Sequence, residues 1–179
     1  AIECARTLDF SKRDIFIENE RELNFLNREL ARYIARLFGE QLSEQDRDYL
    51  SHALHSISDL ERVGDHAENI LDGARMKEQE GVKFTPKVLG ELQDMHSRVD
   101  SQLDKALNLF RSQKASAADI DGIEAKEEEI DQLTEALRNH HVDRLKNKKC
   151  SPRNGMIYLD MLTNLERVAD HAENIATAV

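Results

Sequence analysis

A twelve-residue segment occurs twice in this chain, 105 positions apart. The first copy runs from Asp59 to Ile70 and reads DLERVGDHAENI, and the second runs from Asn164 to Ile175 and reads NLERVADHAENI. Ten of the twelve positions are identical. Chance does not produce such a match in 179 residues, so we expect the fold to contain two copies of one structural unit.

A weaker match, displaced by 107 positions, lies upstream of each copy. It aligns four residues in each half of the chain: Phe16, Glu20, Leu23 and Asn24 in the first, and Ile123, Glu127, Ile130 and Asp131 in the second. Each unit therefore contains at least two related segments.

Apolar residues recur with helical spacing along nearly the whole chain. The chain has only 2 Pro and 7 Gly, and no segment shows the alternation and β-branched enrichment of a strand. This pattern predicts an all-α protein with helices near 12–39, 43–80, 86–113, 118–147 and 152–178. Long helices that are joined by short loops pack as an antiparallel bundle.

Residues typical of helix ends bound these segments. The expected N-caps, each a hydroxyl residue at the start of a helical pattern, are Ser11, Ser43, Thr85 and Ser151. Thr85 and Ser151 are each followed by a proline, which favours the first helical position. Gly39 and Gly81 are predicted to end the first two long helices.

The composition argues against several classes of function. The net charge of −10 disfavours nonspecific binding to nucleic acid, whose phosphate backbone attracts basic proteins. No apolar run approaches the roughly 20 residues that cross a bilayer, so we expect no insertion of this segment into a membrane. The two cysteines are isolated, which indicates a reducing compartment such as the cytoplasm. The glycine-rich phosphate loops and the HExxH and GxSxG motifs of common enzymes are missing from the sequence.

Each copy of the repeat carries two acids one helical turn apart. Glu61 and Asp65 in the first copy correspond to Glu166 and Asp170 in the second. At this spacing the two carboxylates lie on one face of the helix, where like charges repel each other. The acids border the apolar stripe of their helix, and we expect no basic residue at the next turn of this face to relieve the repulsion between them.

The upstream segment of the second half adds a further pair of acids. Glu127 occupies a position in the apolar stripe, and Asp131 follows four residues later, whereas the first half has Glu20 followed by Asn24. If the helices pack through their apolar stripes, these side chains converge. Carboxylates that are buried close together are costly unless they are protonated or bridged by cations. Their oxygens suit iron, magnesium, manganese or calcium, and zinc is also compatible. The alternative is that the acids form only a solvated helix face.

The histidines and arginines of the repeat have a different expected role. His66 and His171 follow the acids by one residue and therefore point about 100° away from the carboxylate face. We expect them to be exposed or to make hydrogen bonds between elements, rather than to bind metal. Arg62 and Arg167 are expected to form surface or interhelical ion pairs, and the alternative is that they contact an anion.

Together these motifs resemble the PhoU family of phosphate-uptake regulators. The doubled LERV(G/A)DHAENI sequence and the ExxxD pair at Glu127 and Asp131 support the resemblance, which covers nearly the whole chain. It implies two antiparallel three-helix bundles in tandem, each able to hold a multinuclear cluster of iron or zinc, and no catalytic activity. The metal ligands that it implies are Glu127, Asp131, Glu166 and Asp170 in the second bundle, and Glu20, Glu61 and Asp65 in the first. The first site would be weaker because Asn24 replaces an acid.

The resemblance divides the chain into a first repeat, residues 1–81, and a second repeat, residues 82–179. The segment 86–113 has no full counterpart in the first repeat, which we therefore expect to lack its N-terminal helix. Ile2, Ala5 and Leu8 offer only a short replacement. The apolar stripes left uncovered in the first repeat predict a homodimer formed through that repeat.

Members of the family restrain phosphate uptake either as free regulators or as cytoplasmic tails of sodium-dependent phosphate cotransporters. Because both ends of the chain look like cuts within a longer protein, we expect a cytoplasmic tail of an NptA-type cotransporter. Its partner would be its own membrane domain, at the inner face of the cell membrane. The alternative is a free-standing regulator that contacts the ABC phosphate transporter and its sensor kinase. A third hypothesis, of another class, is an inert helical scaffold without metal.

Overall fold

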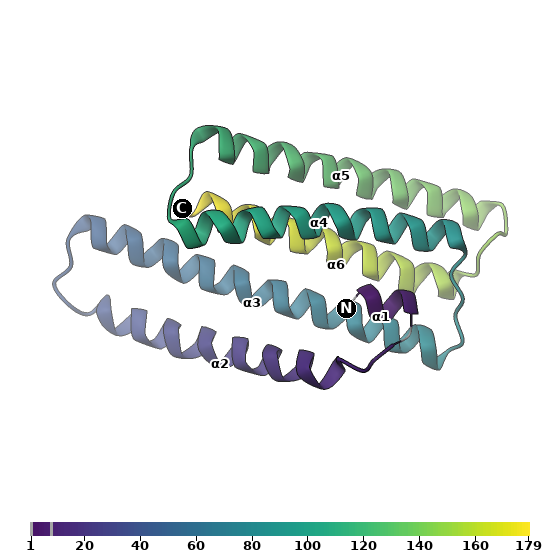
Figure 1. Cartoon of the computed structure of the whole chain (residues 1–179), viewed down its shortest axis with the longest axis horizontal. Helices are drawn as coiled ribbons and strands as arrows, with labels where there is room; N and C mark the ends of the chain where they lie inside the picture. The colour runs from purple at the N-terminus through teal and green to yellow at the C-terminus, as the bar shows by residue number, and fades with distance from the viewer. Residues whose placement is uncertain (1, 8) are drawn as a thin grey trace.

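The computed structural model describes residues 2–7 and 9–179. This part of the chain contains helices and no strand, which confirms the predicted all-α class. The helices are α1 (Ile2–Thr7), α2 (Arg13–Leu37), α3 (Glu44–Gln79), α4 (Pro86–Ser112), α5 (Ala117–Lys146) and α6 (Pro152–Thr177), as Figure 1 shows. The five long helices coincide with the predicted segments to within a residue or two at each end.

Most of the predicted helix ends are confirmed. Ser43, Thr85 and Ser151 each accept a hydrogen bond from a backbone N–H in the first turn of the following helix. Gly81 follows α3 with a φ of +63°, a left-handed conformation that glycine adopts without strain. The start of α5 was not predicted from a cap, although Ser116 forms a reciprocal capping box there.

The predicted N-cap at Ser11 is wrong. Helix α2 begins at Arg13, and its N-cap residue, Lys12, makes no side-chain capping bond. The backbone N–H of Ser11 instead donates to Oδ1 of Asp9 at 2.9 Å. This turn, formed by an aspartate two residues upstream, competes with the capping arrangement for the same stretch of backbone.

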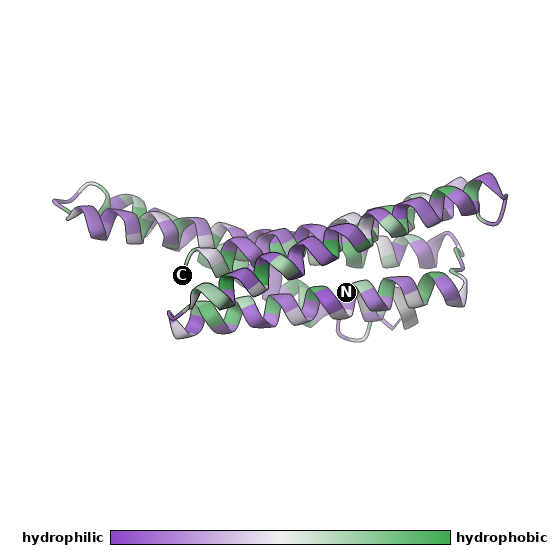
Figure 2. Ribbon diagram, turned by 90° about the horizontal axis from the view of Figure 1, so that it is seen from above, coloured by the Kyte–Doolittle hydropathy of each residue, from purple (hydrophilic) through white to green (hydrophobic). Residues whose placement is uncertain are grey.

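The second repeat is a closed three-helix bundle. α6 packs against both α4 and α5, and α4 also contacts α5. The apolar stripes of the three helices meet in a hydrophobic core. Met95, Ile130 and Met161 are buried in it, each at most 1% exposed. Figure 2 shows hydrophobic and hydrophilic residues side by side along each long helix, as expected of amphipathic helices. Among residues 2–7 and 9–179, no helix combines the length and the apolar character that a membrane span requires.

The first repeat is more open. Among the described helices α2 contacts only α3, and their connecting loop extends beyond the end of the second bundle (Figure 1). Of the apolar stripe predicted on α2, Ile34 is buried, whereas Leu26 and Leu30 are 46% and 43% exposed. The predicted exposure of apolar side chains in this repeat is therefore confirmed. Helix α1 contacts α3 and α4, and Leu8 lies outside the described residues.

The two copies of the repeat face each other along α3 and α6, which make the most extensive contact between helices (Figure 1). Ile70 and Ala74 of α3 belong to the same hydrophobic cluster as Leu165 and Ala169 of α6. The division at residues 81 and 82 falls in the α3–α4 connection, while the hydrophobic core continues across it. This shared core packs α3 against α6, the two helices that carry the repeated acids.

Candidate metal centre

Three carboxylates meet between α5 and α6. Glu127 and Asp131 lie one turn apart on α5, and Asp170 comes from α6. One oxygen from each lies within 4.8 Å of the other two. Within the described part of the chain this is the one group of three side chains placed to hold a metal ion. The structure thus brings together three of the four ligands expected in the second repeat.

The electrostatics of this group are unfavourable in the absence of a cation. Burial, followed by the charges of Asp131 and Glu173, raises the pKa of Glu127 from 4.5 to about 7. A carboxylate that is partly removed from water and close to other acids binds a proton more readily, because its charged form has lost hydration and gained repulsion. The centre therefore carries negative charge that the protein does not fully compensate.

Glu173 of α6 belongs to this acidic region and was not predicted as a ligand. Burial raises its pKa, and the charges of Glu124 and Asp170 raise it further. The signal was present in the repeat, because Glu173 follows Asp170 by three residues and therefore lies on the same helix face. Glu68 holds the equivalent position in the first copy.

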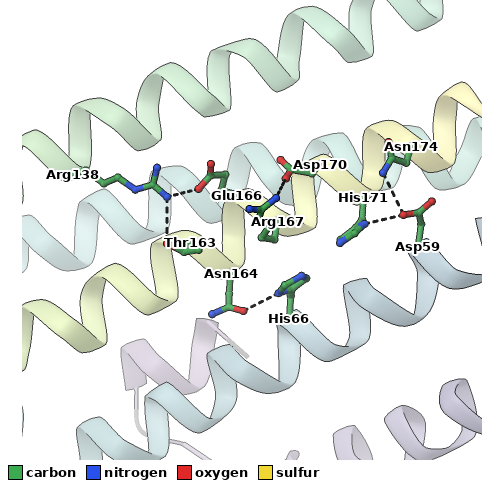
Figure 3. A network of polar contacts seen from close by, with 10 residues as sticks. All are labelled: Asp59, His66, Arg138, Thr163, Asn164, Glu166, Arg167, Asp170, His171 and Asn174. Carbon is green, nitrogen blue, oxygen red and sulfur yellow. Dashed lines mark hydrogen bonds and ion pairs between the residues drawn. The ribbon is translucent and has the colours of Figure 1, made fainter.

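Glu166 lies one turn before Asp170 but is paired with a base. Its Oε2 accepts a hydrogen bond at 2.5 Å from Nη2 of Arg138 on α5, and the same nitrogen donates to Thr163 (Figure 3). Arg167 forms an ion pair with Asp170 at 3.0 Å, as expected for this arginine. The bases that relieve these acids therefore come from the neighbouring helix and from the position directly after Glu166, and not from the next turn of the same face, where none was expected. Arg138 reaches from the neighbouring helix, and sequence spacing on α6 alone does not reveal it.

The acids of the first repeat are less concentrated. Glu20, Glu61 and Asp65 do not form a comparable group of three within the described residues. Nδ2 of Asn24 donates a hydrogen bond to Oε1 of Glu20, so one oxygen of this carboxylate is already engaged. Burial raises the pKa of Glu68, with Glu20 the next largest cause, so acidic side chains do gather here. The first site remains a prediction, with a weaker donor set than the second.

The two histidines of the repeat join α3 to α6. Nδ1 of His66 lies 2.9 Å from Oδ1 of Asn164, and Nδ1 of His171 lies 2.8 Å from Oδ1 of Asp59 (Figure 3). The two rings stack with their centroids 5.4 Å apart. The predicted hydrogen bonding between elements is confirmed. These contacts hold the helices that carry the acids of both repeats against each other.

The chemistry of the second-repeat donor set fits a hard cation. Metal–oxygen bonds of about 2.0–2.6 Å place two ligands of one ion up to about 5 Å apart, and the three carboxylates lie within that span. The group contains only carboxylate oxygens, which suit iron, manganese, magnesium and calcium better than a thiolate-seeking metal. Glu127, Asp131 and Asp170 would hold the ion, and Glu173 lies beside them.

Comparison with known proteins identifies the family of this fold. The PhoU domain matches residues 1–74 and 92–179, which include both copies of the repeat. The chain belongs to the PhoU family. PhoU homologue 1 of Thermotoga maritima, a phosphate-specific transport system accessory protein, is 26% identical over 185 residues that cover 100% of this chain and 76% of the relative. The corresponding homologue of Streptococcus pneumoniae serotype 4 is 27% identical over 176 residues, with 98% and 79% covered.

Solved PhoU structures share this fold. PhoU from Pseudomonas aeruginosa superposes with a TM-score of 0.88 at 21% identity, covering 99% of this chain and 83% of that one. The phosphate transport system regulatory protein PhoU from Streptococcus pneumoniae gives a TM-score of 0.76 at 26% identity, with 99% and 84% covered. The predicted family and the helical-bundle fold are therefore confirmed.

Proposed function

We propose that this chain is a metal-binding regulator of phosphate uptake that acts together with a phosphate-specific transport system. The observation that supports it best is the near-complete match to accessory proteins of such systems, over 100% and 98% of this chain. These relatives favour the transport-system regulator over the cytoplasmic tail of a sodium-dependent cotransporter. The proposed partner is therefore the ABC phosphate transporter with its sensor kinase, on the cytoplasmic side of the membrane.

The metal-binding part of the proposal is supported by the acidic group between α5 and α6. A bound cation would supply positive charge to carboxylates that otherwise repel each other. Glu127 and Asp131 from α5 and Asp170 from α6 are its proposed ligands, with Glu166 at the edge of the group beside Arg138. Because the ligands come from two helices, occupancy would link α5 to α6 and stabilise the surface of the second bundle.

A complementation experiment tests the regulatory role. In a bacterial host whose own PhoU has been deleted, expression of this protein should lower the initial rate of radiolabelled phosphate uptake in phosphate-replete medium. The variant that combines Glu127→Gln with Asp131→Asn should restore this restraint only partly. Glu135→Gln, a substitution at an exposed position of the same helix, serves as the matched control. If the unaltered protein leaves uptake unchanged while it is expressed and folded, the regulatory proposal fails.

Elemental analysis tests the metal site separately. Protein purified from cells grown with ample iron and zinc should retain metal, and the Glu127→Gln and Asp131→Asn variant should retain clearly less than Glu135→Gln. A metal content near zero in the unaltered protein, without a thermal shift when iron or zinc is added, would leave the carboxylates as a solvated acidic face. This result would refute the metal site and leave the uptake experiment to judge the regulatory role.

A further inference from the structure

A small cavity lies at the end of the second bundle where α4 begins, α5 ends and α6 begins. Its volume is about 50 Å³. The polar residues in its walls are Lys83, Thr85, His141, Arg144, Lys149, Cys150, Asn154 and Tyr158. Arg144 lies 13 residues after Asp131 on α5, which separates the cavity from the acidic group by about 20 Å along the helix. The cavity is therefore a different site from the candidate metal centre.

Arg144 is one of the side chains that line this cavity, and its contacts are the best defined. Its guanidinium group lies over the ring of Tyr158, 5.0 Å from the centroid, and its Nη1 donates to both carboxylate oxygens of Glu91 at 2.9 Å. The Nε and Nη2 atoms are buried and make no hydrogen bond of ordinary length and angle among residues 2–7 and 9–179, although the hydroxyl group of Tyr158 also interacts with this guanidinium. A buried N–H of a charged group that lacks an acceptor is costly and rare. These two donors call for a better-placed acceptor than the described residues provide.

The charge of the cavity indicates what kind of acceptor it would take. In a chain with a net charge of −10, the cavity gathers three basic residues, Lys83, Arg144 and Lys149. The nearby carboxylate of Glu91 is already engaged, because it also accepts a hydrogen bond at 3.0 Å from the hydroxyl group of Tyr158. The surplus of positive charge and of unused donors favours an anion over a metal cation.

His141 adds an uncharged polar group to the same walls. Its side chain is 3% exposed, and burial, followed by the charge of Arg144, lowers its pKa. At neutral pH the imidazole is therefore neutral, and it can donate or accept a hydrogen bond depending on its tautomer. Nδ1 of His141 lies 3.9 Å from Sγ of Cys150. The rate at which a reagent modifies Cys150 can therefore be used to detect a ligand in this cavity.

We propose that this cavity binds a tetrahedral oxyanion of the size of inorganic phosphate. A single water molecule needs roughly 10–15 Å³ of cavity volume, so 50 Å³ matches an ion with four oxygens and is too small to enclose a nucleotide. Such an ion provides acceptors for the guanidinium of Arg144 and neutralises Lys83 and Lys149, because charge-assisted hydrogen bonds to phosphate are among the stronger polar contacts in proteins. The first turn of α6, which borders the cavity through Asn154, adds the positive end of its helix dipole. The inference does not rest on the proposed regulatory or metal-binding function.

Titration calorimetry on the full chain, stripped of metal with a chelator, tests this binding. Sodium phosphate should bind with one ion per chain, and sodium chloride at matched ionic strength should give no saturable heat. Lys149→Gln combined with Lys83→Gln removes two exposed cationic side chains without disturbing the half-buried pair of Arg144 and Glu91. We expect this variant to bind phosphate about tenfold more weakly, while Lys114→Gln, exposed at the opposite end of α4, binds as the unaltered protein does.

A second measurement locates the ion. Iodoacetamide should modify Cys150 more slowly in the presence of phosphate, with Cys4 as the internal standard, when both peptides are followed by mass spectrometry. Glycerol 3-phosphate distinguishes a free phosphate ion from the end of a phosphate monoester. A cavity that closes around its ligand admits the free ion and not the monoester. Equal phosphate affinity in the Lys83 and Lys149 variant and in Lys114→Gln would overturn the proposal. So would an unchanged rate of Cys150 modification at saturating phosphate.

Discussion

Replacing Glu127 with glutamine should stabilise the metal-free protein, and the gain should grow with pH. The folded state raises the pKa of this side chain from 4.5 to about 7, so between these two values the folded state binds the proton more tightly than the unfolded state does. Stability falls with rising pH wherever the folded state holds more protons. The cost of Glu127 is therefore absent well below pH 4.5, builds up between pH 4.5 and about 7, and is complete above pH 7.

The magnitude follows from the size of the change in pKa. A carboxyl group whose pKa rises from 4.5 to about 7 would lower the free energy of unfolding by about 3 kcal/mol if it were fully shielded from water. Glu127 keeps part of its contact with solvent, which reduces the figure to about 1–2 kcal/mol. Glutamine has nearly the same shape and no charge. For a chain of this length we therefore expect Glu127→Gln to raise Tm by roughly 2–8 °C at pH 8 and by clearly less at pH 5.

Thermal unfolding followed by circular dichroism, in chelator and at both pH values, measures this effect. Glu135→Gln on the same helix controls for the removal of one negative charge from an acidic protein. An increase in Tm that is equal at pH 5 and pH 8, or equal to that of Glu135→Gln, would refute the local origin of the effect. Adding the cognate metal should reverse the order, since the unaltered protein then gains more than the variant.

Other substitutions test separate parts of the structure. Glu166→Gln should lower the free energy of unfolding of the metal-free protein by about 0.5–1 kcal/mol, because it removes the charged partner of Arg138. If the chelator-treated variant is as stable as the parent in urea denaturation, this pairing is contradicted. Leu30→Glu should shift the protein towards monomer in light scattering, because this 43% exposed leucine lies on the face predicted to form a homodimer. A parent protein that is already monomeric at tens of micromolar would refute that interface. Gly155→Ala should destabilise the second bundle by about 1–3 kcal/mol, since its new methyl group would lie 2.3 Å from Nε2 of buried His141. An unchanged Tm would show that α5 and α6 separate easily at this contact.

Local chemistry explains why the helices were predictable. The caps at Ser43 and Thr85 depend on a side chain that reaches a backbone N–H three residues ahead, so neighbouring residues suffice to identify them. The repeat was equally direct, because identical residues in two helices build identical faces. The failure at Ser11 has the same local scale, since Asp9 offers a competing turn two residues upstream.

Part of the candidate site follows from the same local geometry. Glu127 and Asp131 share a face because they are one turn apart, and a glutamate within an apolar stripe already indicates unusual surroundings. The charge on this group can be counted from the sequence. What the sequence does not contain is the rotation of α6 about its own axis relative to α5, which selects the side chains that come within reach of one another.

Tertiary packing determines which side chains meet, and it gives different partners to two acids of α6 that the sequence pattern treats as equivalent. Asp170 joins the acidic group, while Glu166 meets Arg138, a residue 28 positions away in the sequence. The cavity around Arg144 has the same origin, because its walls come from the ends of three different helices. Helical periodicity specifies which face each residue occupies, since it depends only on backbone hydrogen bonds within the helix. The partner on the facing helix depends on how complete apolar surfaces interlock, and only the folded structure provides that information.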